Sequence, residues 1–148
     1  MTTVDDAWQR ALDAEHQAVF GYALLGPHLD AAADADRARA CQDQHATLRD
    51  HTAAALIAAG QTPDSPHADY PSLYPVRDAS AARSLAIRLE DDATASWRFL
   101  YAVAAAAPSP PAGLRAAAQQ ALTDGAVRAL RWRVAAGAAT PTVAFPGI

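Results

Sequence analysis

The sequence contains neither lysine nor asparagine, so all 12 of its basic residues are arginine. It is rich in alanine instead, and because alanine and arginine have GC-rich codons, this bias is typical of a GC-rich genome. Acidic residues outnumber basic ones by 16 to 12, which gives a net charge of −4. Because phosphate binding requires a clustered positive surface, we do not expect nucleic acid to be the main partner.

Cysteine is nearly absent as well, since Cys41 is the only one. No disulfide can form within the chain, which is compatible with a reducing compartment. The first six residues lack the basic and apolar segments of a signal peptide. No stretch approaches the roughly 20 consecutive apolar residues of a membrane span. We therefore expect a cytoplasmic protein that has no membrane partner.

The common short catalytic signatures are also missing. The sequence has no glycine-rich phosphate loop, no Ser-His-Asp set and no Cys-x-x-Cys pair. Any function must therefore be sought in the pattern of the helices.

What the chain does contain is enough apolar material for one core, because 51% of its 148 residues are hydrophobic. A chain of this size is typical of a single domain, here residues 1–148. Its alanine content favours helix, since alanine loses no side-chain entropy there. We expect an all-α fold.

Glycine and proline divide the chain into four predicted helices, at about residues 3–25, 36–59, 78–107 and 111–136. Proline interrupts a helix because it lacks the amide and clashes with the preceding turn. Gly60 and Gly137 are well placed to end the second and fourth helices. Pro111 is expected to be the first residue of the fourth helix.

Residues 61–77 contain four prolines and cannot form a regular helix. A helix of about 25 residues is roughly 37 Å long, whereas 17 extended residues reach roughly 55 Å. The segment can therefore cross the full length of a bundle, with Tyr70, Leu73, Tyr74 and Val76 attaching it to the outside. The sequence thus predicts a four-helix bundle of two antiparallel hairpins joined by a long proline-rich crossover.

Residues 138–148 follow the last predicted helix and contain two prolines. We expect an extended C-terminal tail, with Val143, Phe145 and Ile148 as its apolar anchors on the bundle.

One pattern occurs in the first helix of each predicted hairpin. It reads Glu-x-x-Ala-x-x-x-aromatic, and its members are Glu15, Ala18 and Tyr22, then Glu90, Ala93 and Trp97. Offsets of three and seven residues place all three members on one helix face. Each face is otherwise apolar, so each glutamate should be buried. A buried carboxylate is costly unless it is paired, protonated or bound to a metal.

The second predicted helix has one strongly polar residue on its apolar face, His45, with Cys41 one turn earlier. Together with Glu15 and Glu90, His45 is a candidate for a shared buried site. Cys41 is expected to be a buried, unreactive thiol beside it.

This arrangement resembles the ferritin-like superfamily, and in particular the ferritin-like domains of unknown function that are common in actinobacteria. The resemblance rests on the two repeated motifs, on His45 and on the proline-rich crossover. In metal-binding members the first and third helices each supply a glutamate, while the second and fourth each supply Glu-x-x-His. The resemblance therefore implies that Glu15, His45 and Glu90 occupy ligand positions.

The sequence departs from that pattern at the remaining ligand positions. Gln42 stands where a bridging carboxylate should precede His45, and Asp43 lies about 100° further round the helix. The fourth predicted helix has no histidine, and its only acid is Asp124. Because two metal ions need several carboxylates to offset their charge, dinuclear iron chemistry is not expected.

Two hypotheses remain. In the first, the chain is a non-enzymatic scaffold or binding module without a cofactor. Its acids are then neutralised by a charged His45, with the second carboxylate either protonated or paired with an arginine, Arg128 or Arg131. In the second, Glu15, His45 and Glu90 hold a single iron, manganese or zinc ion. An arginine in the gap between these side chains would argue against the second hypothesis.

The residues expected to line this polar core share inward positions on the four helices or nearness to the acids. They are Glu15, Tyr22, Cys41, Gln42, His45, Glu90, Trp97, Asp124 and Arg128. A weaker third hypothesis is a small ligand between the helices, since Gly21 and Gly125 leave room near the acids. A homodimer is also compatible with a symmetric bundle, and the sequence specifies no protein or small-molecule partner.

Overall fold

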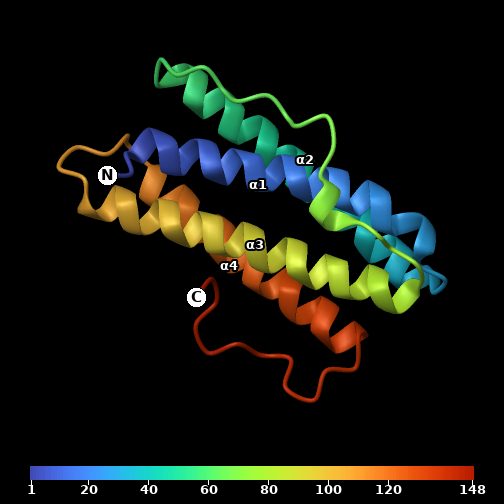
Figure 1. Cartoon of the computed structure of the whole chain (residues 1–148). Coiled ribbons are helices and arrows are strands. Elements are labelled where there is room, and N and C mark those ends of the chain that lie inside the picture. Colours follow the sequence, from blue (N-terminus) through green and yellow to red (C-terminus); the bar gives the residue numbers. More distant parts are fainter.

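The computed structural model describes all 148 residues and is entirely helical apart from its connections. The four long helices are α1 (Val4–Leu25), α2 (Ala32–Ala58), α3 (Ala79–Ala106) and α4 (Leu114–Ala135). Two short 3₁₀ helices, η1 (Gly26–His28) and η2 (Pro71–Leu73), lie in the connections. Figure 1 shows two antiparallel hairpins, α1–α2 and α3–α4, joined by a long crossover. The prediction of an all-α four-helix bundle is confirmed.

Side-chain caps begin α1 and α3 close to where the sequence predicts. Thr3 accepts a hydrogen bond from the amide of Asp6 at 3.1 Å, and Asp6 accepts one from the amide of Thr3 at 2.9 Å. Asp78 accepts a hydrogen bond from the amide of Ala81 at 2.7 Å. These bonds satisfy amides that the first helical turn leaves unpaired.

The other two helices begin elsewhere than predicted. α2 begins at Ala32, four residues before Asp36. The alanines of this stretch have a high helix propensity, and the negative charge of Asp34 is favourable at the positive end of the helix dipole. α4 begins at Leu114 rather than at Pro111. The residue before it, Gly113, has a φ of 76°, a conformation that glycine adopts without steric cost.

The helices are not packed evenly around the bundle. α1 packs against both α2 and α3, and α3 packs against α4, whereas the backbones of α2 and α4 hardly approach each other and these helices meet through long side chains such as Arg128 and Gln44. The buried apolar side chains form two clusters, one around Trp8, Leu100 and Leu114 and the other around Leu25 and Trp132. The polar core lies between these clusters, at the middle of the helices.

The crossover lies along α1 and is held by both apolar and polar contacts. Tyr70 and Leu73 are buried, and Gln9 of α1 donates a hydrogen bond to the carbonyl of Thr62 at 2.8 Å. Tyr74 is 48% exposed, but its ring lies edge-on to that of Phe20 of α1, with 6.5 Å between the ring centroids. The segment follows the length of the bundle, as predicted (Figure 1).

The C-terminal tail is not anchored by the residues that the sequence suggested. Val143, Phe145 and Ile148 are 47%, 70% and 83% exposed. The tail instead contacts the bundle through the backbone of Gly147, whose carbonyl accepts a hydrogen bond from Arg98 at 3.3 Å. A side chain at position 147 would lie 2.9 Å from Cδ of Arg98, so the approach requires a residue as small as glycine.

None of the four helices combines the length and the apolar character that crossing a membrane would require.

Candidate functional site

Two buried carboxylates lie opposite each other at the centre of the bundle. Glu15 of α1 and Glu90 of α3 are the only glutamates in the chain, and both are completely shielded from solvent. Each lies in a largely apolar face of its helix, because the buried neighbours one turn away include Ala11, Leu12 and Ala18 for Glu15, and Ala86 and Ala93 for Glu90. Burial of two such groups requires partners for all their oxygens.

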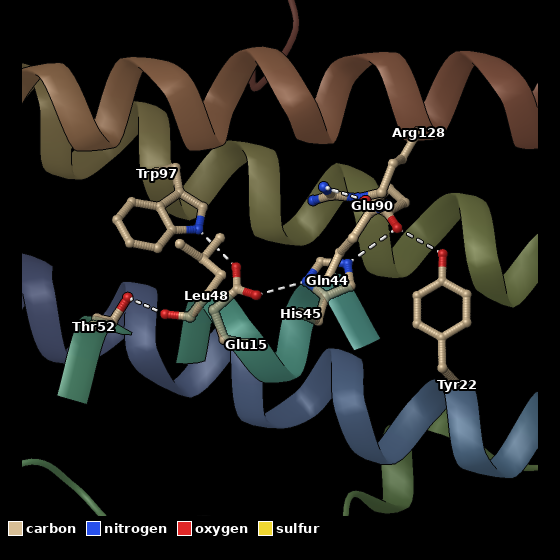
Figure 2. A network of polar contacts seen from close by, with 9 residues as sticks. All are labelled: Glu15, Tyr22, Gln44, His45, Leu48, Thr52, Glu90, Trp97 and Arg128. Carbon is tan, nitrogen blue, oxygen red and sulfur yellow. Dashed lines mark hydrogen bonds and ion pairs between the residues drawn. The ribbon is translucent and has the colours of Figure 1, made fainter. Parts of the chain in front are cut away.

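The repeated motif supplies the first of these partners reciprocally. The indole N–H of Trp97 on α3 donates to Glu15 Oε1 at 2.7 Å, and the hydroxyl of Tyr22 on α1 donates to Glu90 Oε1 at 2.6 Å. The residue numbers of each pair add up to the same total. This is expected when two antiparallel helices face each other in a single register. The motif is therefore a clasp in which each helix's aromatic residue holds the other helix's acid (Figure 2).

His45 of α2 lies between the two acids and contacts both. Its Nδ1 lies 2.6 Å from Glu15 Oε2, and its Nε2 lies 3.0 Å from Glu90 Oε1. Because ionised carboxylates only accept hydrogen bonds, these contacts require a proton on each ring nitrogen. Burial alone would lower the pKa of His45, but the hydrogen bonds and charges of Glu15 and Glu90 outweigh it and raise the pKa from 6.5 to about 9.

Arg128 of α4 supplies a second cation. Its Nε donates to Glu90 Oε2 at 2.9 Å, and its Nη1 donates to Gln44 Oε1 of α2 at 3.3 Å. Burial raises the pKa of Glu90, but His45, Arg128 and Tyr22 together outweigh it, so the pKa is lowered overall. Two ionised carboxylates thus face one imidazolium and one guanidinium, and the core is electrically neutral.

The hydrogen-bonded chain continues beyond Glu90 towards the second apolar cluster. Trp132 donates its indole N–H to the hydroxyl of Tyr22 at 2.8 Å, and the ring of Tyr22 stacks on His45 at 5.7 Å between centroids. Cys41 is buried beside them, and burial together with the charge of Glu90 raises the pKa of its thiol. These contacts leave the thiol protonated and shielded, as expected for an unreactive cysteine.

Two residues expected in the core lie elsewhere. Gln42 points to α1, where its amide lies 3.4 Å from the carbonyl of Val19. Asp124 is exposed and accepts a hydrogen bond from Gln120 at 2.9 Å, because it lies off the inward face of α4. Arg131, the alternative cation, is also exposed.

Two contributors were not expected from the sequence. Gln44 is exposed and adjacent to His45, and no pattern marks it as a partner of Arg128. Trp132 is the second, since nothing in its spacing indicated a bond to Tyr22. For the two acids the sequence did offer an indication, because Glu15 and Glu90 are the only glutamates in the chain.

The room expected beside Gly21 and Gly125 is filled by neighbouring side chains. A Cβ at position 21 would lie 2.5 Å from Cδ1 of Leu89, and one at position 125 would lie 2.5 Å from Oγ1 of Thr94. Both glycines allow close helix packing next to the core and leave no space for a ligand there.

The fold and the core define a four-helix bundle whose centre is a closed, charge-balanced polar network. The chain belongs to the family described as Domain of unknown function (DUF4439), which matches residues 7–148. It is similar in structure to a conserved hypothetical protein, rv2844, from Mycobacterium tuberculosis, with a TM-score of 0.79 and 31% sequence identity over 89% of this chain and 96% of that chain. No curated protein matches the sequence.

Proposed function

We propose that this chain is a non-enzymatic helical scaffold or binding module of the ferritin-like type, in which a polar core stands where metal-binding relatives hold metal. The observation that carries the proposal is the contact between Arg128 and Glu90 at 2.9 Å. A guanidinium there supplies the positive charge that a metal ion would otherwise supply.

The ferritin-like assignment is supported by the arrangement of the elements. The two hairpins, the long crossover and the inward glutamates on α1 and α3 follow the pattern of that superfamily. His45 on α2 occupies the position of the expected histidine. The second helix lacks the expected carboxylate, since Gln42 stands in its place, and the fourth brings an arginine to the centre in place of a histidine and a carboxylate.

The residues present do not fit a dinuclear metal centre. Three side chains could act as ligands, Glu15, His45 and Glu90, and each already has hydrogen-bond partners from other helices. A metal would require His45 to lose a proton and Arg128 to leave Glu90, since both cations lie where the ion's charge would be. The competing hypothesis, a single iron, manganese or zinc ion, needs the same two changes.

The proposal is tested by elemental analysis of protein expressed in medium supplemented with iron, manganese and zinc. We expect no transition metal in stoichiometric amount, below about 0.1 equivalent per chain. The matched variants are Glu15→Gln, which removes a core carboxylate, and His67→Gln, which removes an exposed histidine. One equivalent or more in the native chain, retained in His67→Gln and lost in folded Glu15→Gln, would show that the core is a metal site.

A further inference from the structure

A cleft opens between α2 and α4, where these helices fail to pack. It has a volume of about 670 Å³ and lies at the end of the bundle where α2 ends and α4 begins. Trp8, Trp97, Leu48 and Leu114 line it together with small side chains. This volume is in the range of sites for small molecules, which are about 300–1,000 Å³ and mainly apolar.

The cleft exists because the facing positions of the two helices carry very small side chains. Ala55 and Ala59 of α2 and Ala117 and Ala121 of α4 line it, where leucine or phenylalanine would close a four-helix bundle. Ala55, Ala59 and Ala117 are exposed in the chain as it stands. The opening is therefore built into the sequence of two helices.

The ionisable residues at this end of the cleft are Asp124 and His51, and the adjoining polar hollow adds Asp43 and Arg128. Asp124 is the only arginine, aspartate or glutamate among the residues that line the apolar cleft. It also lines the adjoining polar hollow. The charge of Arg128 is balanced by Glu90, whereas Asp124 and Asp43 make no ion pair and are exposed.

An apolar chamber that ends at unpaired carboxylates fits a molecule with the opposite charge at one end. We infer that the α2–α4 cleft binds a small amphipathic amine, with its aromatic or aliphatic body against Trp8 and Trp97 and its ammonium group near Asp124 and Asp43. This inference rests on the proposed binding-module function and adds the class of ligand. Trp97 links the two sites, since its ring lines the cleft and its N–H holds Glu15.

The test compares three probes that share one apolar body, namely 4-phenylbutylamine, 4-phenylbutan-1-ol and 4-phenylbutyrate. Binding is measured by titration calorimetry and by the fluorescence of Trp8 and Trp97. We expect the amine to bind about three- to tenfold more tightly than the alcohol, because a partly exposed ion pair contributes on the order of 1 kcal/mol. The carboxylate should bind most weakly.

Two pairs of variants locate the site. Asp124→Asn should remove the preference for the amine, whereas Asp36→Asn, which removes the same charge at the far end of α2, should retain it. Ala55→Phe should fill the cleft and abolish binding, whereas Ala54→Phe should leave it intact, since Ala54 is exposed and does not line the cleft. Unfolding curves establish that each variant is folded.

The inference is overturned if none of the probes binds the native chain at 10 mM, on the order of the weakest ligand affinities. It is also overturned if the amine and the alcohol bind equally, or if Ala55→Phe binds as well as Ala54→Phe. None of these outcomes bears on the metal content of the core, so a failure of this inference is distinguishable from a failure of the proposed function.

Discussion

At the scale of single residues, the least usual feature of this protein is the burial of two carboxylates, which costs free energy of folding. Removing such an ion from water costs several kcal/mol even after the surroundings relax. Bonds from Trp97, Tyr22, His45 and Arg128 offset this cost, and each of the four helices supplies one of these partners. A network of this kind fixes the register of the helices, because a shifted helix would leave an acid unpaired.

Loss of the arginine should be the most damaging single change in the core. Arg128→Ala leaves Glu90 with one cation fewer in a buried site, so the free energy of unfolding should fall by about 3–5 kcal/mol. Urea denaturation measures it. Arg131→Ala, on the exposed face of the same helix, should change it by less than about 0.5 kcal/mol. Equal effects of the two substitutions would refute the role given to Arg128.

The hydroxyl of Tyr22 is bonded on both sides, to Glu90 and to Trp132. Tyr22→Phe keeps the ring but leaves the buried indole N–H of Trp132 without an acceptor, at a cost of about 1–3 kcal/mol. The control is Tyr101→Phe, because Tyr101 is on the surface and makes no hydrogen bond through its hydroxyl. Thermal unfolding should separate the two variants clearly, and a native-like Tyr22→Phe would contradict the network.

At the scale of the elements, the helices differ in how well their inward faces could be predicted. On α1 and α3 the residues predicted to share one inward face are all buried, namely Glu15, Ala18, Tyr22, Glu90, Ala93 and Trp97. On α2 the helical spacing that continues from His45 would place Ala55 inward, yet Ala55 is exposed and the neighbouring Leu56 is buried. Because alanine occurs on every side of α2, its apolar residues do not mark which face points inward. In addition, the inward face of a straight helix rotates by about 20° every seven residues relative to a strict seven-residue repeat.

The contact of α1 with α3 depends on a residue without a side chain. In Gly21→Ala the new Cβ would lie 2.5 Å from Leu89, and this overpacking should lower the free energy of unfolding by about 1–3 kcal/mol. Gly26→Ala places its Cβ in open space and should be neutral or stabilise by up to about 1 kcal/mol. Chemical denaturation of both variants is the measurement. A stabilised Gly21→Ala would show that the two helices are less closely packed than described.

At the scale of the whole molecule, the order of helices and the crossover were predictable from glycine and proline, which interrupt helices for steric reasons. The two acids were predictable because they are the only polar residues in their stripes. Of their partners, His45 was expected and Arg128 was one of two candidates, whereas the bonds from Tyr22 and Trp97 were not expected because spacing does not distinguish these rings from ordinary core residues. Asp124 was expected in the core only as the sole acid of its helix, and its angular position on α4 places it on the surface.

The charge of His45 should make global stability depend on pH. The pKa of His45 is about 9 in the folded chain, against 6.5 for an unperturbed histidine. Because the folded pKa is the higher one, the stabilisation is complete below pH 6.5 and is lost as the pH rises through about 9. Between those values the free energy of unfolding should fall by about 3 kcal/mol.

Urea denaturation from pH 5.5 to 10 measures this dependence. His67→Gln, which removes an exposed histidine, should show the same decline as the native chain, whereas a folded His45→Gln should show little decline over the range. A native chain of constant stability between pH 6.5 and 9 would mean that His45 does not carry the charge assigned to it.

The protonation of His45 can also be observed directly, by nitrogen-15 NMR of histidine-labelled protein across the same pH range. The neutral core described here requires both ring nitrogens of His45 to carry a proton at pH 7, up to a transition near pH 9. A ring nitrogen without a proton at pH 7, as a bound metal or a neutral imidazole would produce, would contradict the closed, charge-balanced core.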